Sequence, residues 1–365
     1  MRLSLNLPLS ASSRADARRR KHDMTSVLNI FDQDAFGVVE LNEEVVQKID
    51  YKPQLLGSLN LFRPIYSRSR FIAIAKKEGK LALIPTSQTG EPPEELNLKG
   101  SDVRPFKTKR LAEGSTIYAE ELQGVLGMPM DMAVRDMQAE VVDRMADIQD
   151  DMELTWEHQR LGAIQGIVYD SDGTTVLENW YTNWDITQPT EINFALGTPG
   201  TNVRGKCKEV ERGMKTAAKG VWTPSTEIHA IVGDTFYDDL ISHPNVEKFY
   251  LQWAAAADLQ TAGAAYGAFS FGNITWHNYR GTDDGTSISV GTDKAKFFPV
   301  NARGAFQVGW APAEFEPYVN QRGKEKYGMI LPDPSGRNAF RRVEMYSYPL
   351  FICTRPEMLY SARGR

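Results

Sequence analysis

The nearest approach to a catalytic nucleophile in this chain is Ser270, within the segment Ala268-Phe269-Ser270-Phe271-Gly272. A nucleophile elbow needs glycine two residues before and two residues after the serine, because the backbone must turn sharply to expose the hydroxyl. Here Ala268 stands in place of the first glycine, and the segment is typical of a strand. The sequence therefore predicts no catalytic serine.

Two acidic loops have residue types that could hold a cation. Asp170-Ser171-Asp172-Gly173 begins like a calcium loop but lacks the later ligands, and a hairpin turn explains it better. Gly281-Thr282-Asp283-Asp284-Gly285 is better explained as a solvated loop tip. The histidines show neither HxxxH nor HExxH spacing and are interpreted as structural; they are His22, His158, His229, His243 and His277.

Nucleotide-binding motifs are absent from the sequence, since it contains neither GxxxxGK[ST] nor GxGxxG. The seven tryptophans and fourteen tyrosines could line a sugar groove, although aromatic residues more often serve as core and interface anchors. We therefore predict no catalytic residue, no cofactor and no metal site.

The composition is typical of a folded globular protein of 365 residues with one large or two smaller domains. Hydrophobic residues make up 41% and charged residues 24%, and no apolar run approaches the roughly eighteen residues of a membrane span. The two cysteines, Cys207 and Cys353, form no CxxC pair, which favours a reducing compartment. A formal net charge of −5 argues against a dedicated nucleic-acid binder.

The first 23 residues are rich in arginine and serine and poor in acids. Such a segment resembles an organellar transit peptide. The alternatives are a flexible basic arm or a misplaced start with true initiation at Met24, and we favour these two. Whether residues 1–23 belong to the mature chain stays open at this stage. Residues 24–62 are expected to form an extended arm with one short helix at 42–49.

The strongest structural signal is residues 130–166, a segment without proline and with no glycine before Gly162. At 1.5 Å per residue it predicts a helix of roughly 50–55 Å, about three times the ordinary length. Its apolar residues recur at steps of three and four, which is the pattern of one continuous helical stripe. They are Val134, Met137, Val141, Met145, Ile148, Met152 and Trp156.

A basic segment precedes this acidic helix. Residues 63–110 carry eleven Lys and Arg against five acids, a net charge of +6, whereas residues 131–160 carry nine acids against three arginines, a net charge of −6. Opposite charges favour a contact between the two elements, within a subunit or between neighbours. Two independently solvated faces explain the same charges equally well. The residues predicted to make an inter-subunit contact are Arg70, Lys76, Lys77, Lys80, Asp143, Asp147, Asp150 and Asp151.

The remaining elements are predicted as short strands and helices. The basic segment is expected to contain a β-hairpin with strands at 71–75 and 81–84, then a turn-rich tip and a returning strand at 102–109. A hairpin at 166–183 follows the long helix and turns at Asp170–Gly173. Further helices are expected at 199–219, 235–242 and 246–257, and strands at 227–232, 268–280, 296–300, 305–310, 342–353 and 356–360.

This order of elements resembles the major capsid proteins of tailed bacteriophages, which have the Hong Kong 97 coat fold. More narrowly, it is similar to the group of the phage lambda major head protein, capsid protein E. One local match follows a Gly- and Asp-rich loop and is Phe297-Phe298-Pro299-Val300-Asn301-Ala302-Arg303-Gly304. Two further matches lie near the end of the chain and are Glu344-Met345-Tyr346-Ser347-Tyr348-Pro349-Leu350 and Arg355-Pro356-Glu357-Met358-Leu359. In architecture the resemblance covers nearly the whole chain from about Met24.

The resemblance implies an α+β Hong Kong 97-like coat fold with five segments. Residues 1–62 would be an N-terminal arm, and 63–115 an extended β-hairpin loop that reaches over a neighbouring subunit. Residues 116–189 would form a peripheral domain with its spine helix at 130–166. Residues 190–335 would form an axial domain, and 336–365 would return as strands of the peripheral domain.

The function implied by the resemblance is that of a coat protein and not of an enzyme. Copies would assemble as hexamers and pentamers into the icosahedral shell that encloses the double-stranded DNA of a tailed phage. The expected partners are a separate scaffolding protein and a portal, together with the decoration protein that this group often uses. Only weak, non-specific contact with packaged DNA and no membrane contact are expected. The protein would assemble in the host cytoplasm and reside in the virion.

Two other functions remain open on the sequence alone. An encapsulin-type compartment shares the coat fold but houses enzymes instead of a genome. A carbohydrate-active enzyme with a Trp-lined cleft would instead be a monomer or dimer with a deep polar pocket. Electron microscopy of the purified protein separates the coat fold from the enzyme, because only the coat fold predicts shells, pentamers or hexamers. Neighbouring terminase and portal genes would favour the phage coat, and an enzyme with a docking tail would favour the compartment.

Overall fold

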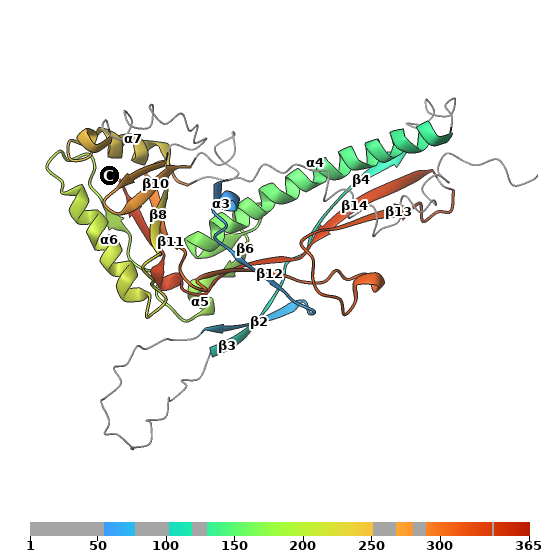
Figure 1. Ribbon diagram of the computed structural model, residues 1–365, viewed down its shortest axis with the longest axis horizontal. Helices are drawn as coiled ribbons and strands as arrows, with labels where there is room; N and C mark the ends of the chain where they lie inside the picture. Colours follow the sequence, from blue (N-terminus) through green and yellow to red (C-terminus); the bar gives the residue numbers. More distant parts are fainter. Residues whose placement is uncertain (1–54, 77–101, 119–129, 251–267, 280–289, 338) are drawn as a thin grey trace, which may run out of the picture. The chain divides into compact units, whose positions relative to one another are not determined.

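The computed structural model describes residues 55–76, 102–118, 130–250, 268–279, 290–337 and 339–365 (Figure 1). These residues form helices and several separate sheets, in agreement with the predicted α+β class. The chain divides into two compact units, which are described separately. The first contains residues 1–50, 112–149 and 326–346, and the second contains 51–111, 150–325 and 347–365.

The long helix is α4, Met130–Gln165, of 36 residues and about 54 Å, so the predicted helix at 130–166 is confirmed. It ends where Gly166 takes a φ of +86°, the left-handed conformation that commonly terminates helices. A Cβ atom at this position would collide with the ring of Tyr181. Both the backbone conformation and the close approach therefore require glycine.

The apolar stripe predicted on α4 is buried wherever its side chains are described. Its five described members are at most 5% exposed; they are Val141, Met145, Ile148, Met152 and Trp156. The side chains of Val134 and Met137 lie outside the described residues. Packing of this stripe, more than intrinsic helix propensity, stabilises the helix.

The described strands of the first unit form a three-stranded sheet in the order β13-β14-β4. Their bounds are Tyr327–Pro332 for β13, Phe340–Ser347 for β14 and Leu111–Tyr118 for β4. Arg144 of α4 links the helix to this sheet, because its guanidinium donates to the carbonyl of Thr116 at 2.6 Å and also pairs with Glu140 at 2.7 Å.

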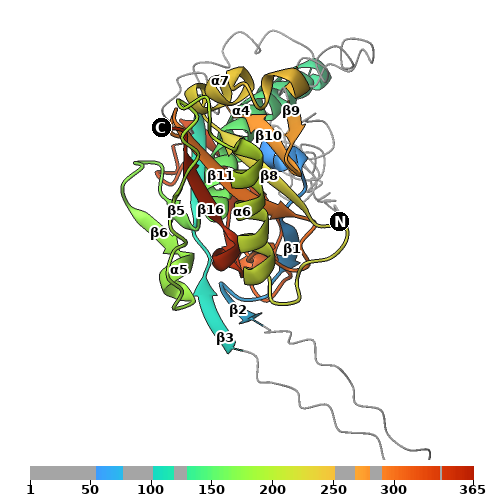
Figure 2. The same cartoon turned by 90° about the vertical axis from the view of Figure 1, so that its left-hand side faces the viewer.

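A six-stranded sheet forms the centre of the second unit, with β8 parallel to β10 and antiparallel to β11. Helices α6, Val203–Ala217, and α7, Asp234–Ser242, share a core with its strands. In Figure 2, α6 runs in front of β8, β11 and β16. In spatial order the strands are β7 Ile192–Asn193, β16 Tyr360–Arg363, β11 Lys294–Val300, β8 Glu227–Val232, β10 Ile274–Asn278 and β9 Ala268–Phe271.

Both faces of strand β8 are covered, which explains its nearly continuous apolar sequence. Ile228, Ala230 and Val232 contact the core that contains α6 and α7. Ile231, on the opposite face, belongs to the second core cluster of this unit. Side chains alternate between the faces of a strand, so one strand supplies both clusters.

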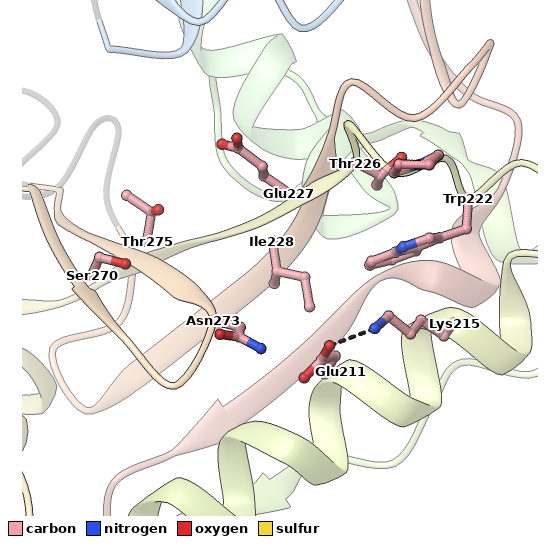
Figure 3. A pocket seen from close by; sticks show the side chains of 10 residues that line it. Glu211, Lys215, Trp222, Thr226, Glu227, Ile228, Ser270, Asn273 and Thr275 are labelled. Carbon is pink, nitrogen blue, oxygen red and sulfur yellow. Dashed lines mark hydrogen bonds and ion pairs between the residues drawn. The ribbon is translucent and has the colours of Figure 1, made fainter.

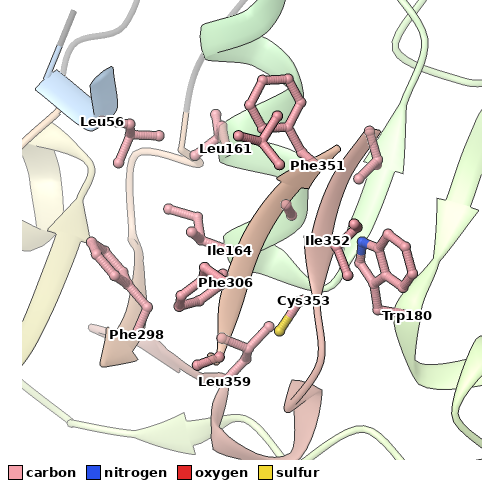
Figure 4. Packing of buried hydrophobic residues seen from close by; sticks show 14 of the residues in the cluster. Leu56, Leu161, Ile164, Trp180, Phe298, Phe306, Phe351, Ile352, Cys353 and Leu359 are labelled. Atoms are coloured by element: carbon pink, nitrogen blue, oxygen red, sulfur yellow. The ribbon is translucent and has the colours of Figure 1, made fainter. Parts of the chain in front are cut away.

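The second core cluster surrounds a three-stranded sheet, β1-β12-β15, together with the end of α4 (Figure 4). Leu161 and Ile164 of α4 pack there with Phe306 and Phe351. The contributing elements are α3 Leu55–Ser58, β1 Arg63–Tyr66, α5 Trp180–Asn183, β12 Phe306–Trp310 and β15 Pro349–Cys353. This cluster joins segments that lie far apart in the sequence.

Two smaller strand pairs complete the described structure. Strand β2, Phe71–Lys76, pairs antiparallel with β3, Asp102–Lys107. Strand β5, Ile167–Tyr169, pairs with β6, Val176–Asn179, which confirms the hairpin predicted after the long helix. Two short 3₁₀ helices are η4 at Glu316–Tyr318 and η5 at Pro356–Met358.

Several predicted elements differ from the structure. Residues 268–280 were expected as one strand, but they form β9 and β10 around a turn at Gly272 and Asn273, whose φ values are 66° and 65°. Two consecutive left-handed residues make the tight turn that matches strand twist in a hairpin. Residues 342–353 are two strands in different sheets, β14 and β15. The prediction of a strand at 356–360 is wrong, because Pro356 begins a 3₁₀ helix and strand β16 starts only at Tyr360.

Other predictions fall partly or wholly outside the described residues. These are the arm helix at 42–49, the strand at 81–84 and most of the helix at 246–257, of which 247–250 are helical. The predicted helix at 199–219 is shorter at both ends, and the Asn202 side chain accepts from the backbone N–H of Gly205 at its start. Strand β13 was not predicted.

Candidate functional site

The paired strands β2 and β3 form a two-stranded ribbon at the base of the basic segment. The inner face of this ribbon is packed, because Ile72 and Ile74 are at most 4% exposed and belong to the core cluster around β12 and β15. Phe106 of β3 lies on the same face and makes edge-to-face contacts with Trp180 and Trp184. These contacts attach the ribbon to its own unit.

The outer face of the ribbon is apolar and open. Phe71 is 58% exposed and Val103 is 53% exposed. Ala73 and Pro105, which pair across the strands, are also exposed on this face. A ribbon with one packed and one open apolar face has a surface that a further partner can cover.

Four of the basic residues at the base of the segment pair with acids of the same unit. The Glu314 carboxylate forms ion pairs with the guanidinium groups of Arg70 at 3.4 Å and Arg110 at 3.0 Å. Lys109 pairs with Glu178 at 3.0 Å and Arg104 with Asp185 at 2.8 Å. The guanidinium of Arg70 also lies 5.0 Å from the ring centroid of Tyr348. These cations hold the base of the segment in place.

The lysines predicted to carry the contact lie farther along the segment. Lys76 ends β2, but its side chain is not among those described, and Lys77 and Lys80 fall outside the described residues. The four predicted cations therefore divide into two groups. Arg70 has a partner within its own chain. Lys76 is the last residue of the ribbon strand β2, and Lys77 and Lys80 follow it in the sequence, outside the described residues.

The four aspartates predicted on the long helix are exposed and share one side of α4. Positions 143, 147, 150 and 151 follow helical spacing, opposite the buried stripe of Val141 and Met145. Within the described residues, the carboxylates of these four aspartates form no ion pair. This acidic stripe, Asp143, Asp147, Asp150 and Asp151, leaves four negative charges on one exposed helix face.

Two glutamates that contribute to the acidic charge of α4 are buried and do not lie on its exposed face. Glu153 is 5% exposed and Glu157 only 1% exposed. Glu157 accepts hydrogen bonds from the backbone N–H groups of Leu56 at 2.8 Å and Gly57 at 3.1 Å. No local pattern around Glu157 indicates this role, because the donors lie about one hundred residues earlier in the chain.

The carboxylate of Glu157 satisfies donors at the start of the short helix α3. The Tyr279 hydroxyl donates to it at 3.3 Å, and Arg160 forms an ion pair with it at 3.3 Å. Burial raises the pKa of Glu157, while the Leu56 N–H and the Arg160 charge act in the opposite direction. This buried carboxylate fastens the segment before β1 to the long helix.

The chain is similar in sequence to phage major capsid proteins. A family model described as phage major capsid protein E matches residues 39–363. The major capsid protein of Salmonella phage Felix O1 is 26% identical over 293 residues, covering 71% of this chain and 77% of that protein. The major capsid protein of Pseudomonas phage KPP10 is 31% identical over 176 residues, covering 43% of this chain and 48% of that protein.

The chain belongs to the phage major capsid protein E family. Among solved structures, the capsid of Myoviridae phage XM1 is 11% identical and covers 87% of this chain and 94% of that chain, with a TM-score of 0.47. The family and the order of the described elements agree with the Hong Kong 97 coat fold that the sequence resemblance implied.

As a major capsid protein, the chain forms the shell of a phage head and is a component of the virion. The match to this family favours the phage coat over the compartment shell and the carbohydrate-active enzyme among the functions left open by the sequence. The surfaces of interest in such a protein are those that can contact other copies. The open ribbon face and the acidic stripe are two such surfaces.

The residues considered for chemistry have structural surroundings in this capsid protein. Ser270 is an exposed residue of β9, and the Asp172 carboxylate accepts from the N–H groups of Thr174 and Thr175 within its turn. Across the described ranges, no group of three or more His, Cys, Asp or Glu could hold a metal ion. No described helix is both long and apolar enough to cross a membrane.

The structure brings together two histidines that sequence spacing did not connect. His229 of β8 and His277 of β10 share a hydrogen bond of 2.9 Å between Nδ1 and Nε2, and both are buried. Burial and the neighbouring His229 lower the pKa of His277 to about 4, so it is neutral near pH 7. The pair joins adjacent strands, in agreement with a structural role.

Proposed function

We propose that copies of this capsid protein assemble as hexamers and pentamers, here called capsomers, into an icosahedral shell around double-stranded DNA. In this proposal residues 63–115 are an extended loop that reaches over a neighbouring copy. Residues 1–62 form the arm, 116–189 a peripheral domain with α4 as its spine, 190–335 an axial domain, and 336–365 return strands. Strand β16 adds the end of the chain to the six-stranded sheet.

The observation that carries this proposal is the open apolar face of the β2–β3 ribbon. Phe71 and Val103 are already nearly half buried, so covering the rest of each side chain would stabilise a contact by roughly half of the 1.5–3 kcal/mol that full burial contributes. A two-stranded ribbon is only marginally stable by itself, so a partner on its open face would also stabilise the ribbon. In a protein that forms a shell, a second copy of the chain is the partner always present.

Charge gives the proposed contact its orientation. Lys76, Lys77 and Lys80 of the loop would face the acidic stripe of α4 on a neighbouring copy. Complementary potentials steer association and suppress wrong pairings more than they add affinity. Arg70 would act differently, because its ion pair with Glu314 makes it a positioning residue at the base of the loop.

The other partners follow from the phage capsid group that this chain resembles. We propose a separate scaffolding protein, a portal, and a decoration protein on the assembled shell. Contact with packaged DNA would be weak and non-specific, assembly would occur in the host cytoplasm, and the chain would have no enzymatic activity. These expectations are supported by the family, whose members are named as capsid proteins.

The test replaces the exposed residues of the ribbon without disturbing its packed face. In Phe71→Ser with Val103→Ser, we expect an unchanged melting temperature for unassembled subunits and a loss of shells by electron microscopy and sedimentation. The matched control is Val176→Ser with Val319→Ser, two residues that are 51% and 55% exposed. Normal shells from the ribbon variant would overturn the proposed loop contact.

A further inference from the structure

The outer face of α6 in the second unit carries a row of cations. Arg204, Lys208, Arg212 and Lys215 follow one another at steps of four, four and three residues, so they share one side of the helix. All four residues are exposed. Lys215 pairs with Glu211 at 2.5 Å, whereas Lys208 and Arg212 form no ion pair within the described residues. The face is distinctly basic in a chain of net charge −5.

Exposed aromatic surface adjoins the first cation of this row. The guanidinium of Arg204 lies 5.2 Å from the ring centroid of Phe249 and 5.9 Å from that of Phe271. Phe249 is 48% exposed and packs edge-to-face on Phe271 at 5.8 Å. Arginine and aromatic residues are enriched at the centres of protein–protein interfaces, where lysine and acids are depleted.

The same part of the unit contains an open sheet edge. Strand β9 is the last strand of the six-stranded sheet and, within the described residues, pairs only with β10. A strand at the edge of a sheet is a common place for a partner chain to bind. Phe271 is the last residue of β9, so this edge continues into the aromatic surface around Arg204.

A pocket of about 520 Å³ lies between the later part of α6 and the β9–β10 hairpin (Figure 3). Trp222 forms one wall, and the Lys215 ammonium lies 5.5 Å from its ring centroid. Asn273 of the hairpin turn and Ile228 of β8 line the same space. A tryptophan in a concave site with hydrogen-bonding groups around it is typical of an interface anchor pocket.

We propose that these features form a single lateral interface, and that a second copy of this chain occupies it within the capsomer. The interface comprises the α6 row, the Arg204–Phe249 surface, the β9 edge and the Trp222 pocket. The proposal rests on the proposed assembly into hexamers and pentamers. In such rings each copy uses two different surfaces, so a basic face on one side requires a different, complementary face on the other.

The chain offers acidic surface for that complementary face. Asp234 and Asp238 are exposed and lie one turn apart on α7, and the chain as a whole has more acids than bases. Duplex DNA is the competing partner for a basic helix face. DNA phosphates, however, have no need of the exposed Phe249 or of the Trp222 pocket, so the combination favours a protein surface.

The experiment reverses two cations of the row in the full-length protein. For Lys208→Glu with Arg212→Glu, we expect the subunit concentration at half assembly to rise at least tenfold, measured by sedimentation velocity and native mass spectrometry. Phe249→Ser is expected to act in the same direction. The matched control is Lys206→Glu with Arg303→Glu, because Lys206 lies off the row and pairs with Glu209. The subunit concentration at half assembly of the control should stay within about twofold of the wild-type value. The melting temperatures of all variants should be unchanged.

The outcomes separate this proposal from the assembly on which it rests. If the wild type forms capsomers, and if the Lys208→Glu/Arg212→Glu protein and the Phe249→Ser protein both assemble normally, the lateral interface is overturned and the proposed function stays intact. Normal assembly combined with weaker binding to duplex DNA would also overturn it, and would assign the row to DNA. A wild type that forms neither hexamers nor pentamers would overturn the proposed function and this interface together.

Discussion

Two sets of carboxylates on the same helix have opposite surroundings. Glu157, near the end of α4, is 1% exposed and accepts hydrogen bonds from Leu56, Gly57 and Tyr279. Asp147, in the acidic stripe, is exposed and forms no ion pair in the described part of the chain. One helix thus contains acids that secure the subunit and acids that remain available to other molecules.

The difference shows that charge alone does not identify an assembly surface. A buried carboxylate must be satisfied within its own chain, because an unpaired buried charge is strongly destabilising. An exposed carboxylate is hydrated and contributes little to folding, so it can be used for recognition. The basic segment divides in the same way, since Arg70, Arg104, Lys109 and Arg110 are paired within their own unit.

The largest effect on subunit stability is expected from Glu157→Ala. This substitution leaves two backbone N–H groups and Arg160 without their partner in a buried setting. We expect the free energy of unfolding to fall by about 3 kcal/mol. Urea unfolding of unassembled subunits, followed by circular dichroism, measures the change.

The exposed acids of α4 provide the control for this comparison. Asp150→Ala removes a carboxylate from the acidic stripe, and we expect the unfolding free energy to change by no more than about 0.5 kcal/mol. Equal losses in Glu157→Ala and Asp150→Ala would contradict the division into two sets.

The next effect concerns assembly and not folding. Reversing Lys76, Lys77 and Lys80 to glutamate should place like charges opposite the acidic stripe of a neighbouring copy. We expect at least a tenfold rise in the concentration needed for shell formation, equivalent to about 1.4 kcal/mol, with an unchanged melting temperature. Light scattering and electron microscopy of the assembling protein measure this effect.

A charge swap sharpens that result. Adding Asp143→Lys, Asp147→Lys and Asp151→Lys to the reversed lysines should restore part of the assembly. As a control, reversing three cations elsewhere, at Lys206, Arg303 and Arg337, in the otherwise wild-type protein should leave assembly near the wild-type level. Normal shells from the lysine variant alone would show that the two charged segments are independently solvated.

Much of the fold follows from local sequence patterns. The 3.6-residue periodicity predicts α4 to within one residue of its end, and the apolar run at 227–232 predicts β8 correctly. The turn between β9 and β10 was harder to predict from the sequence, because it depends on two adjacent left-handed residues, Gly272 and Asn273. The break between β14 and β15 depends on which sheet each strand joins, and local sequence does not encode that choice.

The candidate site could be predicted only in part. The four aspartates of the acidic stripe are exposed as expected, because their helical spacing places them opposite the apolar face. The partners of Arg70 and Glu157 could not be predicted, since Glu314 and Leu56 are brought to them by tertiary folding. The strand at 71–75 does contain a usable signal, because both of its faces are apolar although the ribbon packs only one of them.

A smaller effect is expected from Glu314→Gln at the base of the loop. The substitution removes the charge that Arg70 and Arg110 share, and all three side chains are partly exposed. We expect the unfolding free energy to fall by about 0.5–1 kcal/mol, as is usual for exposed pairs. Glu316→Gln, on the nearby η4, is the control and should change nothing measurable. If both variants are indistinguishable from the wild type in thermal unfolding, the base of the loop is not held by these pairs.

The smallest effect is a pH dependence of subunit stability that comes from Glu157. Burial raises the pKa of Glu157 in the folded subunit, so the folded state binds its proton at a higher pH than the unfolded state does. Between those two pKa values the native state holds more protons, and stability therefore rises as the pH falls. Relative to Glu157→Gln, which cannot titrate, the wild type should gain stability from neutral pH down through the raised pKa to the ordinary pKa of a glutamate. Urea unfolding of both proteins over this range measures the difference. A wild-type advantage over Glu157→Gln that shrinks on acidification would mean that the folded subunit favours the charged carboxylate.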